Sequence, residues 1–437
     1  MRRAPGAGAL LRHGLTVALG ALALAPAAGQ LGLQEVVRGT PHATLSNPAL
    51  SLPARLTVQV ASYGTSTQLS FRPRDIGAPD GGRLVISPEA IRAALPEEVR
   101  GRLGLDVSTV IVNCGRDWGQ FGFHHALRGQ ADVRSPRAAL LLVAEGNRVV
   151  LGRPAQVLPQ GYAATWHEFG GHYARRLTGG VTVGARAKLL LGASDLRMAD
   201  PAATVAVSPV DFAVEYDIAA TGYSAGYGLD FGADSLEALR LTLAPGAGVG
   251  AAVDLGIVYA PDRRWAIGLG LRDLGAIRWR GRRHDATGAG VYVGAEGDVF
   301  AEEFSLGALA SYDSVRALVG LRTRPTRYGR GLPAKLTAHA RYDLSRTWTV
   351  GAVSTALLSA GRVYVNAAGT VLYEVWEGLH VGGAAGLGGG GAFAGVSLDA
   401  RLGPVAVYAS TEQALGLLAP YATRNTHGRL GVALVWE

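Results

Sequence analysis

The chain has 437 residues, of which 48% are hydrophobic and only 17% charged, and 62 of them are glycines. Charged residues fall below the roughly 25% of a typical soluble domain and glycine is about twice as common as usual, which disfavours both a helical enzyme and a disordered chain. The net charge of +8 comes from scattered arginines rather than a basic patch, so no nucleic-acid partner is expected. Cys114 is the only cysteine, which excludes an internal disulfide.

Residues 1–29 have the pattern of a secretory signal peptide. Two arginines precede an apolar run over about residues 15–25, and small residues follow, with plausible cleavage after Ala27 or Gly29. The alternative is a membrane-anchor helix, but the run is shorter than the roughly 20 apolar residues that span a bilayer. The mature chain, residues 30–437, is interpreted as one domain, and any membrane location of it is not expected to be helical.

The start of the mature chain combines a loop-like segment with short helices. Residues 30–54 are interpreted as a periplasmic or hatch-like segment and contain the sequence LSNPAL. Residues 87–100 predict a short helix, because Ser87 can cap its N-terminus and Pro88 suits the first turn. A second short helix is predicted near residues 136–145.

Most of the remaining sequence alternates with a period of two, which marks strands with two different faces. In residues 181–191, valine, alanine and leucine share one face, and threonine, glycine, arginine and lysine share the other. Similar alternation recurs over 264–272, 335–343 and 393–401. In 203–218 the pattern slips by one residue, so a bulge is expected at Ser208 and Pro209. A soluble sandwich would also alternate in this way.

Three features favour a closed transmembrane barrel. The strands approach the roughly 9–11 residues that a tilted membrane strand needs, one face mixes charges with small residues, and short turns alternate with long connections. The long connections are expected near 193–202, 219–248, 275–333 and 412–426. Aromatic residues at strand ends suit interface girdles; they are Trp265, Trp279, Trp348 and Trp436. Because backbone polar groups in hydrocarbon all need partners, the sheet must close on itself.

The stretch WHEFGGHYARRL, residues 166–177, raises the question of a zinc site. A zinc protease places two histidines four residues apart on a helix, but His167 and His172 are five apart and flank two glycines. As a strand that turns through TGG, the stretch would place Leu177 opposite Val181.

That register predicts a polar cluster facing the lumen, made of Glu168, His172, Arg186 and Lys188. The cluster has two interpretations: paired charges that fill a narrow interior, or a constriction that contacts a permeant. Other residues expected to face the lumen are Lys335, His339, Arg341 and Asp399.

Two further motifs have ordinary explanations. GLGGGG, residues 386–391, is followed by a strand-like pattern rather than a helix, so a hairpin loop is favoured over a nucleotide site. The arginines at the exit of one strand fit a barrel rim or, alternatively, a site for lipopolysaccharide phosphates or acidic partners; they are Arg278, Arg280, Arg282 and Arg283. Since no catalytic signature stands out, we expect no enzyme, no cofactor and no metal.

An ordered set of sequence segments resembles a family of Bacteroidetes outer-membrane barrels of unknown function, related to the FadL-like long-chain fatty-acid transporters and to PorV-like barrels. The segments are LSNPAL, VTVGARAKLLLGASDL (181–196), LGIVYAPDRRWAIGLGLRDLGAIRWRG (255–281), LPAKLTAHARYDLSRTWTVGAV (332–353), RLGPVAVYASTEQALGLLAP (401–420) and GRLGVALVW (428–436). The resemblance implies an antiparallel barrel of about 14 strands (12–16), with a hatch motif at Asn47, Pro48 and Ala49. Two departures are an irregular segment at 284–332 and a final Glu437 after the terminal tryptophan.

The resemblance also implies a location in the cell outer membrane and two possible functions. One is passive transport of a small hydrophobic solute. The other is a non-transporting barrel that serves as an anchor or accessory of protein secretion, as PorV-like relatives do. Expected partners are outer-membrane lipid, the barrel-assembly machinery and either a hydrophobic small molecule or secretion components.

Overall fold

A computed structural model of the chain describes residues 40–437 except 81–82, 117, 230–238, 242, 293–318, 360 and 390. The expected signal peptide, residues 1–29, lies outside the described residues. Strands dominate the described chain, and the few helices are short. The α-helices are α3 (Ala43–Ser46), α4 (Pro73–Ile76), α5 (Pro88–Ala94), α6 (Arg137–Glu145) and α8 (Ala414–Leu418).

The strands form one large antiparallel sheet and two small hairpins. In the first half of the chain they are β1 (Leu56–Leu69), β2 (Gly77–Asp80), β3 (Arg83–Ile86), β4 (Glu98–Arg116), β5 (Gly119–Pro136), β6 (Ala155–Gln156), β7 (Gln160–Arg176), β8 (Val181–Val207) and β9 (Val214–Ala225). The second half has β10 (Tyr227–Leu229), β11 (Leu239–Leu241), β12 (Gly248–Tyr259), β13 (Trp265–Tyr292), β14 (Arg322–Gly331), β15 (Ala334–Asp343), β16 (Trp348–Ser359), β17 (Arg362–Trp376), β18 (Leu379–Gly388), β19 (Gly391–Leu402), β20 (Val405–Thr411) and β21 (Asn425–Trp436).

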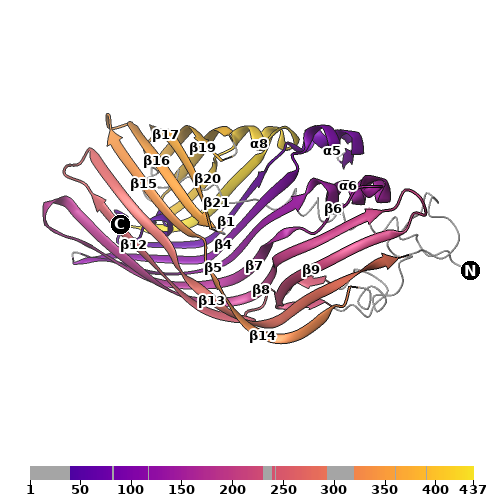
Figure 1. Cartoon of the computed structure of the whole chain (residues 1–437). Helices are drawn as coiled ribbons and strands as arrows, with labels where there is room; N and C mark the ends of the chain where they lie inside the picture. The colour runs from indigo at the N-terminus through magenta and orange to yellow at the C-terminus, as the bar shows by residue number, and fades with distance from the viewer. Residues whose placement is uncertain are drawn as a thin grey trace, which may run out of the picture.

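Within the described residues, 14 strands close into a barrel (Figure 1). The ring runs β1, β4, β5, β7, β8, β12, β13 and then β15 through β21, which pairs with β1 again. Closure gives every wall strand a partner on both sides, so that no backbone edge faces lipid. The expected barrel is therefore confirmed.

One side of the wall is much taller than the rest. β8 has 27 residues and β13 has 28, and their far ends hold β9 between them. β14 pairs with the other edge of β13, opposite the edge that pairs with β12 and β9. Much of the expected connections 193–202 and 275–333 is therefore strand rather than loop. The alternating pattern there is too weak to predict a strand from the sequence, but neighbouring strands supply the hydrogen-bond partners that form one.

The expected bulge at Ser208 and Pro209 is wrong. β8 ends at Val207, the chain turns, and β9 begins at Val214, opposite Val207. The amide of Ser208 donates to the carbonyl of Ala213 and closes the turn. Pro209 cannot donate to a ladder, so this proline ends a strand rather than kinking one.

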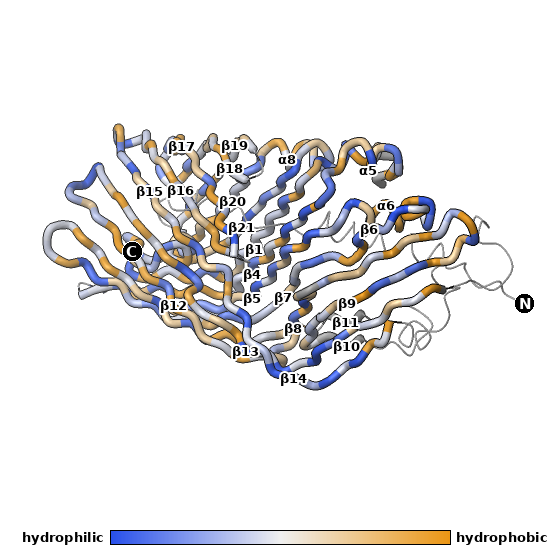
Figure 2. The backbone as a smooth tube through the Cα atoms, viewed as in Figure 1, coloured by the Kyte–Doolittle hydropathy of each residue, from blue (hydrophilic) through white to orange (hydrophobic). Residues whose placement is uncertain are grey.

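The two faces of the wall differ in polarity, and hydropathy alternates along the strands (Figure 2). Large apolar side chains are exposed on the outside, whereas charged and polar side chains are buried inside. At the short-turn end, exposed aromatic rings pair across strands: Trp265 lies 4.7 Å from Tyr342 and Trp348 lies 4.6 Å from Tyr373, centroid to centroid. An apolar exterior with an aromatic girdle is the surface of an integral membrane barrel, and short turns mark its periplasmic end.

Trp279 departs from the expected girdle. Its side chain is fully buried inside the barrel, while Trp265, Trp348 and Trp436 are exposed. The cause is an irregularity in β13 opposite Asp254, where Asp273 adopts a positive φ of 62°. This extra residue shifts the side-chain alternation, so Trp279 points to the opposite face from Trp265.

Both ends of the lumen are associated with non-barrel segments. At the extracellular end, α4, α5 and α6 share an apolar core that includes Phe71, Ile91 and Leu141. The predicted helix at 87–100 ends earlier, at Ala94, because β4 already starts at Glu98. Toward the periplasmic end, residues 40–49 are buried inside the barrel. None of the helices among the described residues is long and apolar enough to cross a membrane.

Candidate functional site

The buried segment at residues 40–50, here called the hatch, rests on a flat seat of glycines. A Cβ on Gly184 of β8 would lie 2.4 Å from the carbonyl oxygen of Pro48, and one on Gly256 of β12 would lie 2.0 Å from Oδ1 of Asn47. On Gly270 of β13 it would lie 2.9 Å from the carbonyl oxygen of Ser46. Three neighbouring wall strands therefore lack side chains where the hatch backbone passes.

Polar contacts fix the hatch in this position. Arg186 of β8 donates to the carbonyl oxygens of Thr44 (2.5 Å) and Leu45 (3.4 Å). On the other side, Arg429 Nη1 lies 3.3 Å from Nδ1 of His42. Asn47 Nδ2 donates to the carbonyl of Ile257, so the hatch motif is tied to the strand that seats it.

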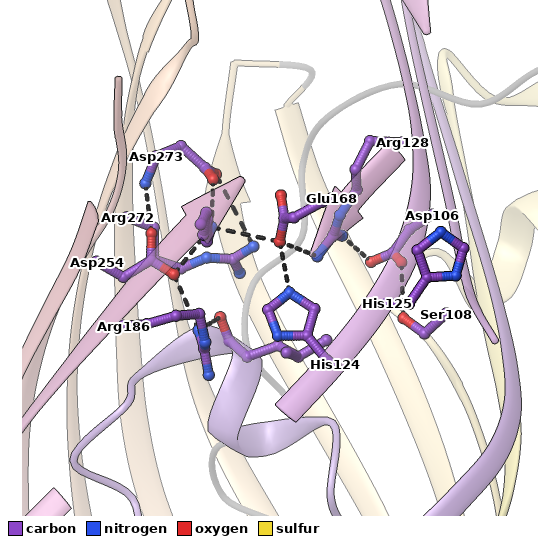
Figure 3. A network of polar contacts seen from close by, with 12 residues as sticks. Asp106, Ser108, His124, His125, Arg128, Glu168, Arg186, Asp254, Arg272 and Asp273 are labelled. Carbon is purple, nitrogen blue, oxygen red and sulfur yellow. Dashed lines mark hydrogen bonds and ion pairs between the residues drawn. The ribbon is translucent and has the colours of Figure 1, made fainter. Parts of the chain in front are cut away.

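A continuous chain of charges, here called the charged belt, links these two anchor points along the inner wall. Figure 3 shows the part of the belt from Asp106 to Arg186. Starting at Arg429, it runs through Asp106 of β4, Arg128 of β5 and Glu168 of β7. It continues through Lys188 of β8 and Asp254 of β12 to Arg186. Because both ends of the belt contact the hatch, the belt forms a clamp around it.

Lys188 is the centre of the belt. Its Nζ lies 2.6 Å from Asp273, 2.9 Å from Asp254 and 3.4 Å from Glu168, and the ammonium group is fully buried. Glu168 also binds Nε2 of His124 at 2.8 Å. A buried charge is tolerated only when it is paired and hydrogen-bonded, and the belt meets that condition by alternating acids with bases.

The structure brings three of the four residues of the predicted cluster into this belt. His172 faces the same lumen opposite Arg186, with the register that the TGG turn predicts. Among the described residues, its Nε2 has no hydrogen-bond partner. The other predicted lumen residues face inward on other strands: His339 packs against Gly268, Lys335 lies opposite Arg272, Arg341 lies near Asp343 and Asp399 lies near His380.

The sequence analysis did not identify most of the belt and the hatch contacts. The missing residues are His42, Asp106, His124, Arg128, Asp254, Asp273, Arg429 and Arg272, which lies 3.9 Å from Asp273. Asp254 carries a usable signal, since it is the single charge in the otherwise apolar and glycine-rich strand VGAAVDLGIVY. The remaining partners come from strands far apart in sequence and could not be matched without the strand order.

An apolar cluster lies next to the belt on its extracellular side. Trp166, Leu190, Ile277 and Trp279 all point inward and pack together with alanines of neighbouring strands. Gly192 and Gly248 leave room for the Trp279 ring, because a Cβ on either would come within 3 Å of it. The indole nitrogens of both tryptophans are buried without a hydrogen-bond partner among the described residues. Such a cluster is unusual in a barrel interior, which is ordinarily polar.

A second polar group follows above the apolar cluster. Asp195 of β8 pairs with Arg330 at 2.8 Å and accepts a hydrogen bond from the hydroxyl of Tyr328 at 2.9 Å. The guanidinium of Arg330 lies 4.1 Å from the centroid of the Tyr162 ring. Along the inner wall the order is therefore hatch, charged belt, apolar cluster and upper polar group. Within the described residues, no group of three or more histidine, cysteine, aspartate or glutamate side chains is arranged to hold a metal ion.

These features define an outer-membrane β-barrel with a hatch inside its lumen. The chain belongs to a family of unknown function (DUF5723), whose profile matches residues 48–412. No curated protein matches the sequence.

Solved structures of similar overall form include two toluene transporters and a FadL homologue. The toluene transporter TbuX of Ralstonia pickettii is 11% identical, with a TM-score of 0.47 and coverage of 91% of this chain and 94% of its own. A FadL homologue of Pseudomonas aeruginosa is 11% identical, with a TM-score of 0.48 and coverage of 93% and 96%. The toluene transporter TodX of Pseudomonas putida is 9% identical, with a TM-score of 0.44 and coverage of 94% of each chain.

Proposed function

We propose that this barrel admits a small hydrophobic solute through the outer membrane by passive transport. The observation that carries the proposal is the apolar cluster of Trp166, Leu190, Ile277 and Trp279 inside the lumen. A water-filled pore for polar solutes has no need of two tryptophans on its inner wall. These side chains are buried against one another, and when they separate a hydrophobic solute gains free energy by taking the place of those contacts.

The position of the cluster supports passage from the extracellular end of the barrel to its periplasmic end. A solute entering from the extracellular end reaches the apolar cluster before the charged belt and the hatch. The hatch then closes the periplasmic side, and its release is the step that lets the solute leave. The hatch is held by hydrogen bonds from Arg186 to its backbone carbonyls, and such bonds can be exchanged for bonds to water when the hatch leaves.

Uptake by whole cells tests this proposal. The protein is produced in a Gram-negative host, and entry of a labelled aromatic hydrocarbon, a labelled fatty acid and a sugar is compared with that in an empty-vector strain. We expect several-fold faster entry of at least one hydrophobic solute and unchanged entry of the sugar. Equal entry of every solute in the two strains would contradict transport.

A second function is favoured by a different observation, the tall side of the wall formed by β8, β9, β13 and β14 (Figure 1). Such a projecting sheet offers a docking surface for another protein, as a secretion accessory requires. Cross-linking in cells of the native host, followed by purification of the barrel, tests it. Recovery of secretion components together with equal solute entry in both strains would favour this function over transport.

A further inference from the structure

Four exposed arginines lie together on the outer face of the barrel, on two paired strands. Arg278, Arg280 and Arg282 alternate along β13, so their side chains share one face. Arg327 of β14 lies directly opposite Arg280 in the ladder, and direct partners point to the same side of a sheet. β14 is hydrophilic over much of its length (Figure 2).

The same strands show that this face is the lipid-facing one. In β13, the buried Ile277 and Trp279 point into the lumen, so the residues between and beyond them point outward. Arg283, which the sequence groups with the other arginines, points inward, where its guanidinium lies 6.0 Å from the ring of Tyr223. The outward set of Arg278, Arg280, Arg282 and Arg327 is here called the arginine ladder.

The arginine ladder begins where the apolar band ends. On the outer face of β13 the apolar residues run from Trp265 at the periplasmic girdle to Ala276. With a rise of about 3.3 Å per residue and a tilt of about 45°, this stretch spans roughly 26 Å of membrane thickness. That value matches the roughly 25 Å apolar band of outer-membrane barrels. Arg278 therefore lies at the level of the outer-leaflet headgroups.

Among the residues that the structure describes, the ladder lacks the acidic partners that neighbouring arginines have. Arg283 and Arg324, on the inward face, lie 2.7 Å and 3.4 Å from the carboxylate of Asp285. Within the described part of the chain, no carboxylate lies within ion-pair distance of the four ladder arginines. Like charges directly opposite each other, such as Arg280 and Arg327, destabilise a sheet. A bound anion would reverse that effect.

We propose that the arginine ladder binds the phosphate groups of an outer-leaflet glycolipid of the lipid A type. Guanidinium groups bind phosphate through paired, charge-assisted hydrogen bonds. Arg280 and Arg327 reach one phosphate together. Arg278 and Arg282 flank it, because they are the outward-facing residues before and after Arg280 in β13. The acyl chains of the same lipid then cover the apolar band below the ladder, which a free phosphate or a soluble anion cannot do.

Binding of purified lipid A to the full chain in detergent tests the proposal, with native mass spectrometry as the readout. The test variant carries Arg278→Gln, Arg280→Gln and Arg327→Gln. The matched control carries Arg263→Gln, Arg264→Gln and Arg346→Gln, which removes three exposed arginines at the periplasmic turns. Heat-modifiable gel mobility verifies that both variants contain a folded barrel.

We expect the ladder variant to bind bis-phosphorylated lipid A at least tenfold more weakly than the wild type, and the control to bind within twofold of it. Removal of the phosphates from lipid A should weaken binding to the wild type by a similar factor. Equal binding by the two variants would overturn the proposal. It would also be overturned if dephosphorylated lipid bound as well as lipid A, or if inorganic phosphate bound the wild type as tightly as the lipid.

Discussion

Glu168 and Lys188 lie diagonally across the pair β7 and β8, with the carboxylate Oε1 3.4 Å from Nζ and both groups buried inside the barrel. Glu168 extends the contact to β5 through His124 and Arg128, and Lys188 extends it to β12 and β13 through Asp254 and Asp273. One ion pair therefore connects the charges of five wall strands. This connection makes the charged belt a single unit rather than a set of local pairs.

The first prediction concerns this pair. Glu168→Gln and Lys188→Met should each lower the free energy of unfolding by about 3–5 kcal/mol, because each removes one charge from a buried network and leaves the neighbouring charges of opposite sign incompletely compensated. The double variant should lose less than the sum, with a coupling energy of about 1–3 kcal/mol. Denaturant unfolding in detergent micelles measures all four proteins. A coupling of zero would show that the two side chains do not interact.

The second prediction concerns the glycine seat. Gly256→Val should displace the hatch, because its Cβ alone would lie 2.0 Å from Asn47. A cysteine placed by Ala49→Cys in a Cys114→Ser background reports this, since Ala49 is buried. We expect at least tenfold faster labelling by a maleimide. The control Gly369→Val, whose Cβ meets nothing within 4 Å, should leave labelling unchanged. Equal labelling rates in the two variants would show that the hatch does not lie against Gly256.

The third prediction concerns the side of the wall that Trp279 occupies. In variants that keep a single tryptophan, bromine-labelled lipid tails should quench the fluorescence of Trp265 strongly and that of Trp279 little. The reason is that Trp265 is 43% exposed on the outer face, whereas Trp279 is 0% exposed inside. Strong quenching of Trp279 by lipid would contradict this and show that its side chain lies in the interface girdle.

The fourth prediction concerns the anchor of the hatch. Arg186→Met removes both hydrogen bonds to the hatch carbonyls and one partner of Asp254. Amide hydrogen exchange in residues 40–50 should accelerate about tenfold or more, while the wall strands stay protected. Arg346→Met, at an exposed periplasmic turn, serves as the control. Unchanged exchange in the hatch would mean that the glycine seat holds it without the belt.

The fold was predictable because its signal is local. Alternation and turn length predict a closed barrel, and the TGG turn alone predicts the register in which His172 faces Arg186. The belt was only partly predictable. Glu168, Arg186 and Lys188 belong to one hairpin, whereas Asp106, Asp254 and Arg429 reach them only through the ring of strands.

The orientation of Trp279 shows where local patterning fails. A single residue, Asp273 with φ of 62°, reverses the faces of everything that follows it in β13. A hint exists in the sequence: the apolar spacing changes from two to three residues between Leu271 and Leu274. Aspartate is among the few residues that tolerate this conformation, but a single change in spacing does not distinguish a bulge from a strand end.

The central claim is that a hydrophobic solute passes the apolar cluster and leaves when the hatch moves. Thr44 of the hatch and Asn113 of β4 touch, with their side-chain oxygens 3.4 Å apart. The variant Thr44→Cys and Asn113→Cys in a Cys114→Ser background therefore offers a disulfide that locks the hatch to the wall.

Uptake of a labelled hydrophobic solute by cells that carry this variant, measured before and after a mild reductant, tests the claim most directly. The account predicts that uptake falls to the empty-vector level with the disulfide formed and recovers severalfold on reduction, while wild-type cells do not respond. Uptake that is equally fast with the hatch locked would contradict it.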